Sequence, residues 1–143
     1  MEFGVDGRPE KGAWRQSFPV SGCGNDTTLN FTFVATPSER VEISVEVPGE
    51  THANLALQRD AFRFAQTTVS PIAKPCRSFD VTNTKFDGFD ASEPSASPSA
   101  EATPPWRETW TLIGCGKRYS VSLSFQAHEK GTQIVADPAE MIQ

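Results

Sequence analysis

The chain has 143 residues, and its 13 Lys and Arg against 18 Asp and Glu give a formal net charge of −5 at pH 7. This length allows a sizeable core, because a chain of about 150 residues buries roughly 68–70% of the surface that it exposes when unfolded. The acidic balance argues against nucleic acid as a partner, since binding to phosphates requires clustered Lys and Arg. We therefore expect a single domain over residues 1–143 that does not bind nucleic acid.

The start of the chain has neither a membrane span nor the apolar core of a signal peptide. Residues 1–20 mix charged and apolar side chains, which predicts a loosely ordered segment. Residues 20–23 read like the box at which bacterial lipoproteins are acylated on Cys23, but the apolar run that precedes such a box is missing. The pattern favours a turn cysteine, and an exported protein would have its signal peptide ahead of residue 1.

The first predicted elements are two strands that form a hairpin. Odd positions are apolar over residues 29–35 and again over residues 41–47, with mostly polar residues between them. Pairing across the intervening turn places every apolar side chain on one face, and a one-residue slip would move them all to the other face. The predicted pairs are Ala35 with Val41, Phe33 with Ile43, Phe31 with Val45 and Leu29 with Val47.

Residues 51–66 carry apolar side chains at helical spacing and few β-branched residues, with Thr51 as a candidate N-cap. We predict a helix of about 14 residues there, with two short strands as the alternative. Its expected apolar residues are Ala53, Ala56, Leu57, Ala61, Phe64 and Ala65. Residues 79–82 and 131–135 have the composition of further strands.

Residues 91–105 contain only Ala, Ser, Glu, Pro and Thr. This composition cannot bury enough apolar surface to offset the entropy of ordering, so we expect a flexible loop inside the domain. Such a loop is either a tolerated insertion, because the cost of loop closure grows slowly with length, or a functional element.

The clearest hairpin lies at residues 106–125, where apolar and polar positions alternate on both sides of a Gly-Cys-Gly turn. The expected inward-facing pairs are Leu112 with Tyr119, Trp110 with Val121, Glu108 with Leu123 and Trp106 with Phe125. Only Glu108 places a charge among them. Because aromatic cross-strand pairs stabilise a sheet, this hairpin should be the best anchored element and should carry the tryptophans of the core.

Together these elements predict an α+β fold, in which an antiparallel sheet of about five or six strands carries one packed helix. A small β-sandwich interrupted by a helix is the alternative.

The three cysteines, Cys23, Cys76 and Cys115, leave three disulfide pairings open and one thiol over. Two of them sit between glycines, which lets the backbone turn sharply and suits a disulfide at a strand end. Three buried reduced thiols are the alternative. No spacing matches a redox or zinc motif, and a disulfide would indicate an oxidising compartment.

No set of residues has the spacing of a catalytic or metal site, so we predict no cofactor and no metal. The strongest enzyme hypothesis combines the Cys76 thiol with His52 or His128 as its base. Asp87 and Asp90 offer too few oxygens for calcium, which takes 6–8 of them.

Aromatic residues gather in sequence around the loop at residues 91–105. They either fill the core or form an exposed patch. We take Phe86, Phe89 and Trp106 as the candidate interaction surface, and edge strands offer a second route to a partner.

One motif resembles a known group of proteins. The pattern Trp106-x-Glu108-x-Trp110-x-Leu112-x-x-Cys115-Gly116-x-x-Tyr119-x-Val121-x-Leu123-x-Phe125, followed by Gly131-Thr132, covers about a fifth of the chain. It resembles the C-terminal signature of small exported or lipoprotein-like bacterial domains of unknown function. The resemblance implies a periplasmic or cell-envelope location and supplies no catalytic residues. We therefore expect a periplasmic or extracellular protein.

The expected function is therefore a non-enzymatic module of the bacterial envelope that binds another protein or a small ligand. A small thiol-dependent enzyme or hydrolase that uses Cys76 with a histidine is the alternative, and a purely structural envelope module is a third hypothesis.

Overall fold

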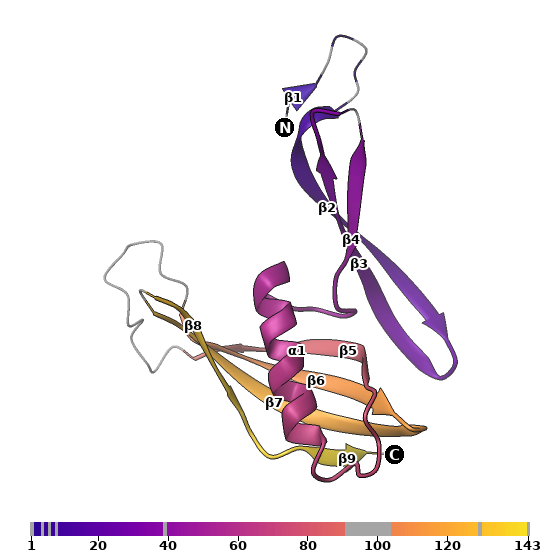
Figure 1. Ribbon diagram of the computed structural model, residues 1–143, viewed down its shortest axis with the longest axis vertical. Coiled ribbons are helices and arrows are strands. Elements are labelled where there is room, and N and C mark those ends of the chain that lie inside the picture. The colour runs from indigo at the N-terminus through magenta and orange to yellow at the C-terminus, as the bar shows by residue number, and fades with distance from the viewer. Residues whose placement is uncertain are drawn as a thin grey trace. The chain divides into compact units, whose positions relative to one another are not determined.

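The computed structural model describes residues 2–3, 5, 7, 9–38, 40–90, 104–128 and 130–142. The chain divides into two compact units, Met1–Pro48 and Gly49–Gln143. Each unit contains an antiparallel sheet, and the second also contains the helix (Figure 1). The predicted α+β class, with one helix packed on a sheet, is confirmed. The strands are divided between two sheets.

The N-terminal unit is a sheet with the strand order β1-β2-β3-β4. Its strands are β1 (Glu2–Phe3), β2 (Pro9–Gly22), β3 (Asn25–Ala35) and β4 (Val41–Val45). The predicted register of β3 with β4 is confirmed from Ala35 opposite Val41 to Phe31 opposite Val45. Because β4 ends at Val45, the fourth predicted pair is not part of the ladder. The amide of Asn30 instead donates to the carbonyl oxygen of Val47, at 3.1 Å.

Strand β2 differs from the expectation for the start of the chain. Residues 1–20 are expected to be loosely ordered, whereas residues 9–20 belong to β2, which pairs with β3 from Gly12 opposite Ala35 to Gly22 opposite Asn25. Its even positions include Trp14, Phe18 and Val20, but interspersed charges and a proline weaken this alternation. Pairing with the strongly patterned β3 supplies the order that the local signal lacks.

The C-terminal unit has the strand order β5-β6-β7-β8, with β9 also paired to β7. Its strands are β5 (Asp80–Phe89), β6 (Trp106–Gly114), β7 (Lys117–His128), β8 (Gly131–Ala136) and β9 (Glu140–Ile142). All four predicted pairs of the β6–β7 hairpin are confirmed. Its inward-facing side chains are all buried and include the largest of the core: Trp106, Glu108, Trp110, Leu112, Tyr119, Val121, Leu123 and Phe125. Of the predicted flexible loop, residues 91–103 lie outside the described residues.

Helix α1 (Leu55–Val69) packs on β7 and β8 (Figure 1). It begins later than predicted, because the side chain of Asn54 caps it by accepting a hydrogen bond from Leu57 N at 2.9 Å. Thr51, the expected N-cap, instead donates to a carboxylate on β6. An Asn at the N-cap satisfies one of the free N–H groups of the first turn.

The buried stripe of α1 also differs from the expected one. Ala61 and Ala65 are buried as predicted, and Gln58 and Val69 complete the buried stripe. Phe64, predicted on the apolar face, is 47% exposed. The sheet already contributes large buried rings such as those of Tyr119 and Phe125, so alanines allow the helix to approach it closely.

The two Gly-Cys-Gly segments form the same hairpin turn in different surroundings. Cys23 and Cys115 have φ of 52° and 50°, and the glycines after them have φ of 73° and 75°, as in a type I′ turn. A Cβ atom on Gly22 would meet no atom, whereas one on Gly114 would overlap the ring of Phe79.

This difference predicts unequal effects of the same substitution. Gly114→Ala should lower the free energy of unfolding by about 1–3 kcal/mol, because overpacking forces the buried Phe79 ring to move. Gly22→Ala should change it by less than about 0.5 kcal/mol, since the position is open. Urea denaturation followed by circular dichroism measures both, and equal effects would show that the Phe79 contact is unimportant.

Candidate functional site

A buried carboxylate organises the centre of the C-terminal unit. Glu108 on β6 is 0% exposed. Its Oε1 accepts hydrogen bonds from Trp106 Nε1 at 2.9 Å and from the backbone N of His52 at 2.8 Å. Its Oε2 accepts from Trp110 Nε1 at 2.8 Å and from Thr51 Oγ1 at 2.9 Å. Four donors therefore surround Glu108, the one charged residue among the predicted inward-facing positions of the hairpin.

The strand geometry explains this arrangement. Residues two apart on a strand point to the same face, so Trp106 and Trp110 flank Glu108 and both indole N–H groups reach its carboxylate. Thr51 and His52 reach the other side from the segment that precedes α1. A buried polar group is tolerated when its hydrogen bonds are satisfied, and Glu108 thus anchors residues 51–52 to the sheet.

This anchor positions a cluster of three rings at the edge of the core. The imidazole of His52 stacks on Phe86, with ring centroids 3.8 Å apart, and lies edge-on to Phe89 at 5.5 Å. Phe86 and Phe89 are 5.0 Å apart. His52 is exposed, Phe86 is half-buried and Phe89 is 48% exposed. We call His52, Phe86 and Phe89 the aromatic cluster.

The predicted interaction surface is thus only partly on the surface. Phe86 and Phe89 lie together, but Trp106 is 5% exposed and stacks on Phe125 with ring centroids 4.9 Å apart. Trp106 belongs to the core because its ring packs on Phe125 and its indole N–H donates to Glu108. His52 was not predicted as a member of this surface. The one sequence signal that bears on its position is Glu108, because an inward-facing carboxylate requires hydrogen-bond donors.

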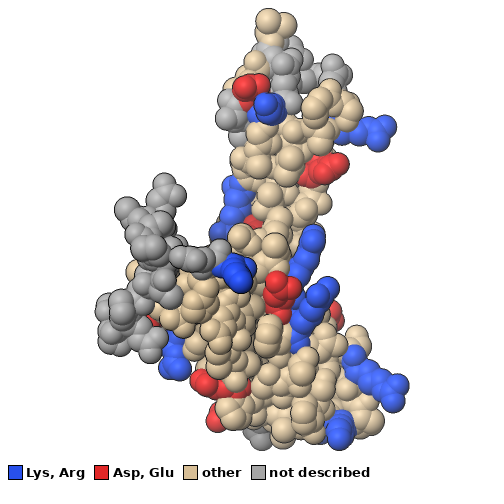
Figure 2. All heavy atoms as spheres, turned by 60° about the vertical axis from the view of Figure 1, so that its left-hand side comes forward, with Lys and Arg blue, Asp and Glu red and all other residues tan. Residues whose placement is uncertain are grey.

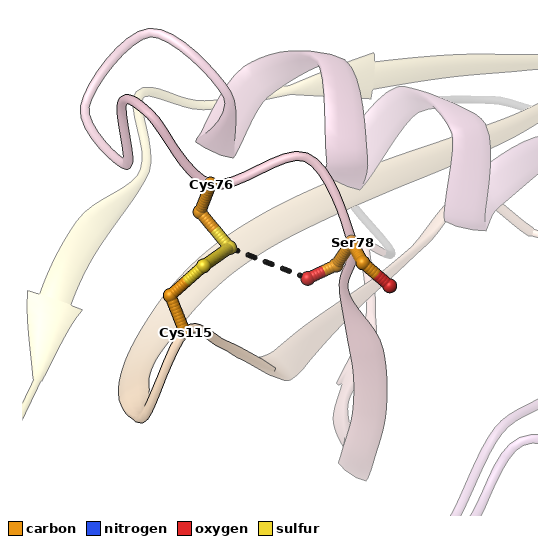
Figure 3. Close-up of a disulfide and its surroundings, with 3 residues drawn as sticks. All are labelled: Cys76, Ser78 and Cys115. Atoms are coloured by element: carbon orange, nitrogen blue, oxygen red, sulfur yellow. Dashed lines mark hydrogen bonds between the residues drawn. A yellow bond between two sulfur atoms is a disulfide. The ribbon is translucent and has the colours of Figure 1, made fainter.

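Cys76 and Cys115 form a disulfide, and Cys23 is free and exposed (Figure 3). The Cα atoms of the pair are 5.8 Å apart. Cys76 Sγ also lies 3.4 Å from the carbonyl oxygen of Ser78. The bridge leaves no Cys76 thiol for the catalytic pair considered above.

The other candidate residues have separate surroundings. His128 is exposed at the end of β7, where its Nε2 lies 3.0 Å from Gln133 Oε1. Asp87 accepts a hydrogen bond from Thr109 Oγ1 and lies 3.7 Å from Lys85 Nζ. Among the described residues, no three His, Cys, Asp or Glu side chains gather as a metal site would require.

The surface and the helix add two observations. On the face drawn in Figure 2, the basic and acidic side chains are interspersed over a mostly uncharged surface. Within the described ranges, no helix has both the length and the apolar character needed to cross a membrane.

The chain matches no protein family, no curated protein and no solved structure.

Proposed function

We propose that this protein is an exported domain of the bacterial envelope, periplasmic or extracellular, with a non-enzymatic binding function. The aromatic cluster is the observation that carries the binding role. The Cys76–Cys115 disulfide supports export, since disulfides persist in oxidising compartments and are rare in the cytosol.

The aromatic cluster suits recognition of a protein. Buried aromatic anchors dominate many protein interfaces, and Phe89 offers nearly half of its surface for such burial. The rings also contact one another, and the backbone of His52 is held by Glu108. A preorganised surface loses little side-chain freedom on binding, which favours affinity. The proposed partner is an envelope protein that presents an apolar or aromatic side chain to this surface.

A photocrosslinking experiment tests the proposal. A photoreactive phenylalanine analogue is placed at Phe89 or at Phe64, which is the matched control because the two are 48% and 47% exposed. The chain is then exported in a bacterial host. We expect position 89 to crosslink to one discrete protein and position 64 to give no such product.

The affinity for the captured protein provides the second measurement. Phe89→Ala should weaken binding at least tenfold, or about 1.4 kcal/mol, whereas Phe64→Ala should leave it unchanged. Equal crosslinking at both positions, or equal affinities of the two alanine variants, would contradict the proposal.

A further inference from the structure

The sheet of the N-terminal unit has one strongly apolar face. The strand register places even positions of β2 beside odd positions of β3 and β4. Between residues 12 and 45, no position on this face of the three strands is charged. Its large apolar side chains are Trp14, Phe18, Val20, Leu29, Phe31, Phe33, Val41, Ile43 and Val45. We call these nine residues the apolar face.

Much of the apolar face is accessible to solvent. The exposed fractions are Val45 70%, Ile43 60%, Phe18 48%, Val41 45%, Val20 38% and Leu29 36%. Summed, these fractions correspond to about three fully exposed residues, which is an accessible area on the order of 500 Å². The largest apolar patch on a typical monomer is about 300–600 Å², and such patches often mark interaction sites.

The opposite face is polar and internally paired. Arg15 Nε donates to Glu46 Oε2 at 2.8 Å, and Thr32 Oγ1 donates to the same oxygen at 3.2 Å. Ser17 Oγ donates to Asn30 Oδ1 at 2.7 Å. One face of the sheet is therefore apolar and the other is polar. The described part of this unit contains only strands of one sheet, so the unit itself supplies no second layer for its apolar face.

We propose that the apolar face packs against the same face of a second copy of this chain, across a two-fold axis. In an isologous interface the same surface patch of both copies is in contact, so a charged patch would face charges of the same sign. A face without charges avoids this repulsion. Two identical sheets have the same twist and length, as an aligned sandwich requires. The two faces together bring on the order of 1,000 Å² of apolar surface, which is about the minimum for a specific interface.

Two other occupants fit the observations less well. Residues 91–103 include no large apolar side chain, so this segment cannot supply the missing layer. Pairing of the β4 edge with a second β4 would extend the sheet but leave the apolar face in water. This inference concerns a different surface from the aromatic cluster and does not depend on the proposed function.

Sedimentation equilibrium of the full chain over a range of concentrations tests the proposal. The wild type should be a dimer. Ile43→Thr combined with Val45→Thr should raise the dissociation constant at least tenfold, because both hydroxyls enter the apolar interface while strand propensity is kept. The matched control, Glu42→Thr with Ser44→Thr, changes the opposite face of the same strand and should leave the dissociation constant unchanged.

A second measurement follows the dimer through its tryptophan emission. Trp14 lies on the apolar face, whereas Trp106 and Trp110 are buried in the other unit. Dilution of the wild type should therefore shift the tryptophan emission to longer wavelength, and Trp14→Phe should abolish this shift. A wild type that stays monomeric throughout overturns the proposal. So does a dimer that is insensitive to the face substitutions but is lost in Ile43→Pro, because that result would assign the contact to the β4 edge.

Discussion

Replacing Glu108 with Ala is expected to lower the free energy of unfolding by about 3–5 kcal/mol. The carboxylate is fully buried and accepts hydrogen bonds from four donors, two of them indole N–H groups. Removing it leaves those donors buried without an acceptor, and each unsatisfied buried group costs about 1–3 kcal/mol. Chemical denaturation followed by tryptophan fluorescence measures the loss, because Trp106 and Trp110 both lie at the site.

Glu108→Gln keeps the shape of the side chain and changes only its hydrogen bonds. Trp106 Nε1 and Trp110 Nε1 donate to different oxygens of the carboxylate. In either orientation of the Gln amide, one indole faces an NH₂ group and loses its acceptor. We expect a loss of about 1–3 kcal/mol. Glu140→Gln, on the exposed strand β9, is the control and should change stability by less than about 0.5 kcal/mol. Equal losses at positions 108 and 140 would rule out the anchoring role.

Removing the Cys76–Cys115 disulfide should cost about 4 kcal/mol, the value expected when a cross-link spans a sequence separation of 39 residues. The cross-link restricts the unfolded chain, and reduction restores that freedom. Denaturation with and without reductant, in a Cys23→Ser background that prevents thiol exchange, measures the difference. The double variant Cys76→Ala, Cys115→Ala should match the reduced protein.

Alkylation and intact mass provide the accompanying check. Without reductant, one thiol should react, that of the exposed Cys23, and with reductant all three should react. Three reactive thiols without reductant would contradict the bridge and remove the support that it lends to export. A single fast-reacting Cys76 would instead favour the thiol-enzyme hypothesis.

Local patterns predicted those parts of the fold in which local chemistry dominates. Two-residue alternation and turn composition were enough for the registers of β3 with β4 and of β6 with β7, since a slip of one residue would expose every apolar side chain. The existence of the helix also followed from its spacing. Its buried face followed only in part: Ala61 and Ala65 are buried as predicted, whereas Phe64 is exposed because of the limited space that the sheet leaves.

The candidate site was less accessible to such reasoning. Phe86 and Phe89 were identified by their place in the sequence, but the same argument put Trp106 on the surface, against the hairpin register that placed it inward. Burial depends on which residues lie across the sheet. The ring of Trp106 stacks on Phe125, and its indole N–H donates to Glu108. The position of His52 depends on a hydrogen bond to a residue 56 positions away. No local pattern encodes a contact over that separation.

The amino-acid sequence by itself thus determined the α+β class, the two hairpins and the odd inward charge at Glu108, because alternation, turns and helical spacing act between near neighbours. Only the tertiary structure decided which cysteines pair, which donors meet Glu108 and which aromatic rings remain at the surface. It also made β2 a strand, through pairing with β3 along its length. These outcomes depend on contacts between distant segments, whose free energy is set by the folded chain as a whole.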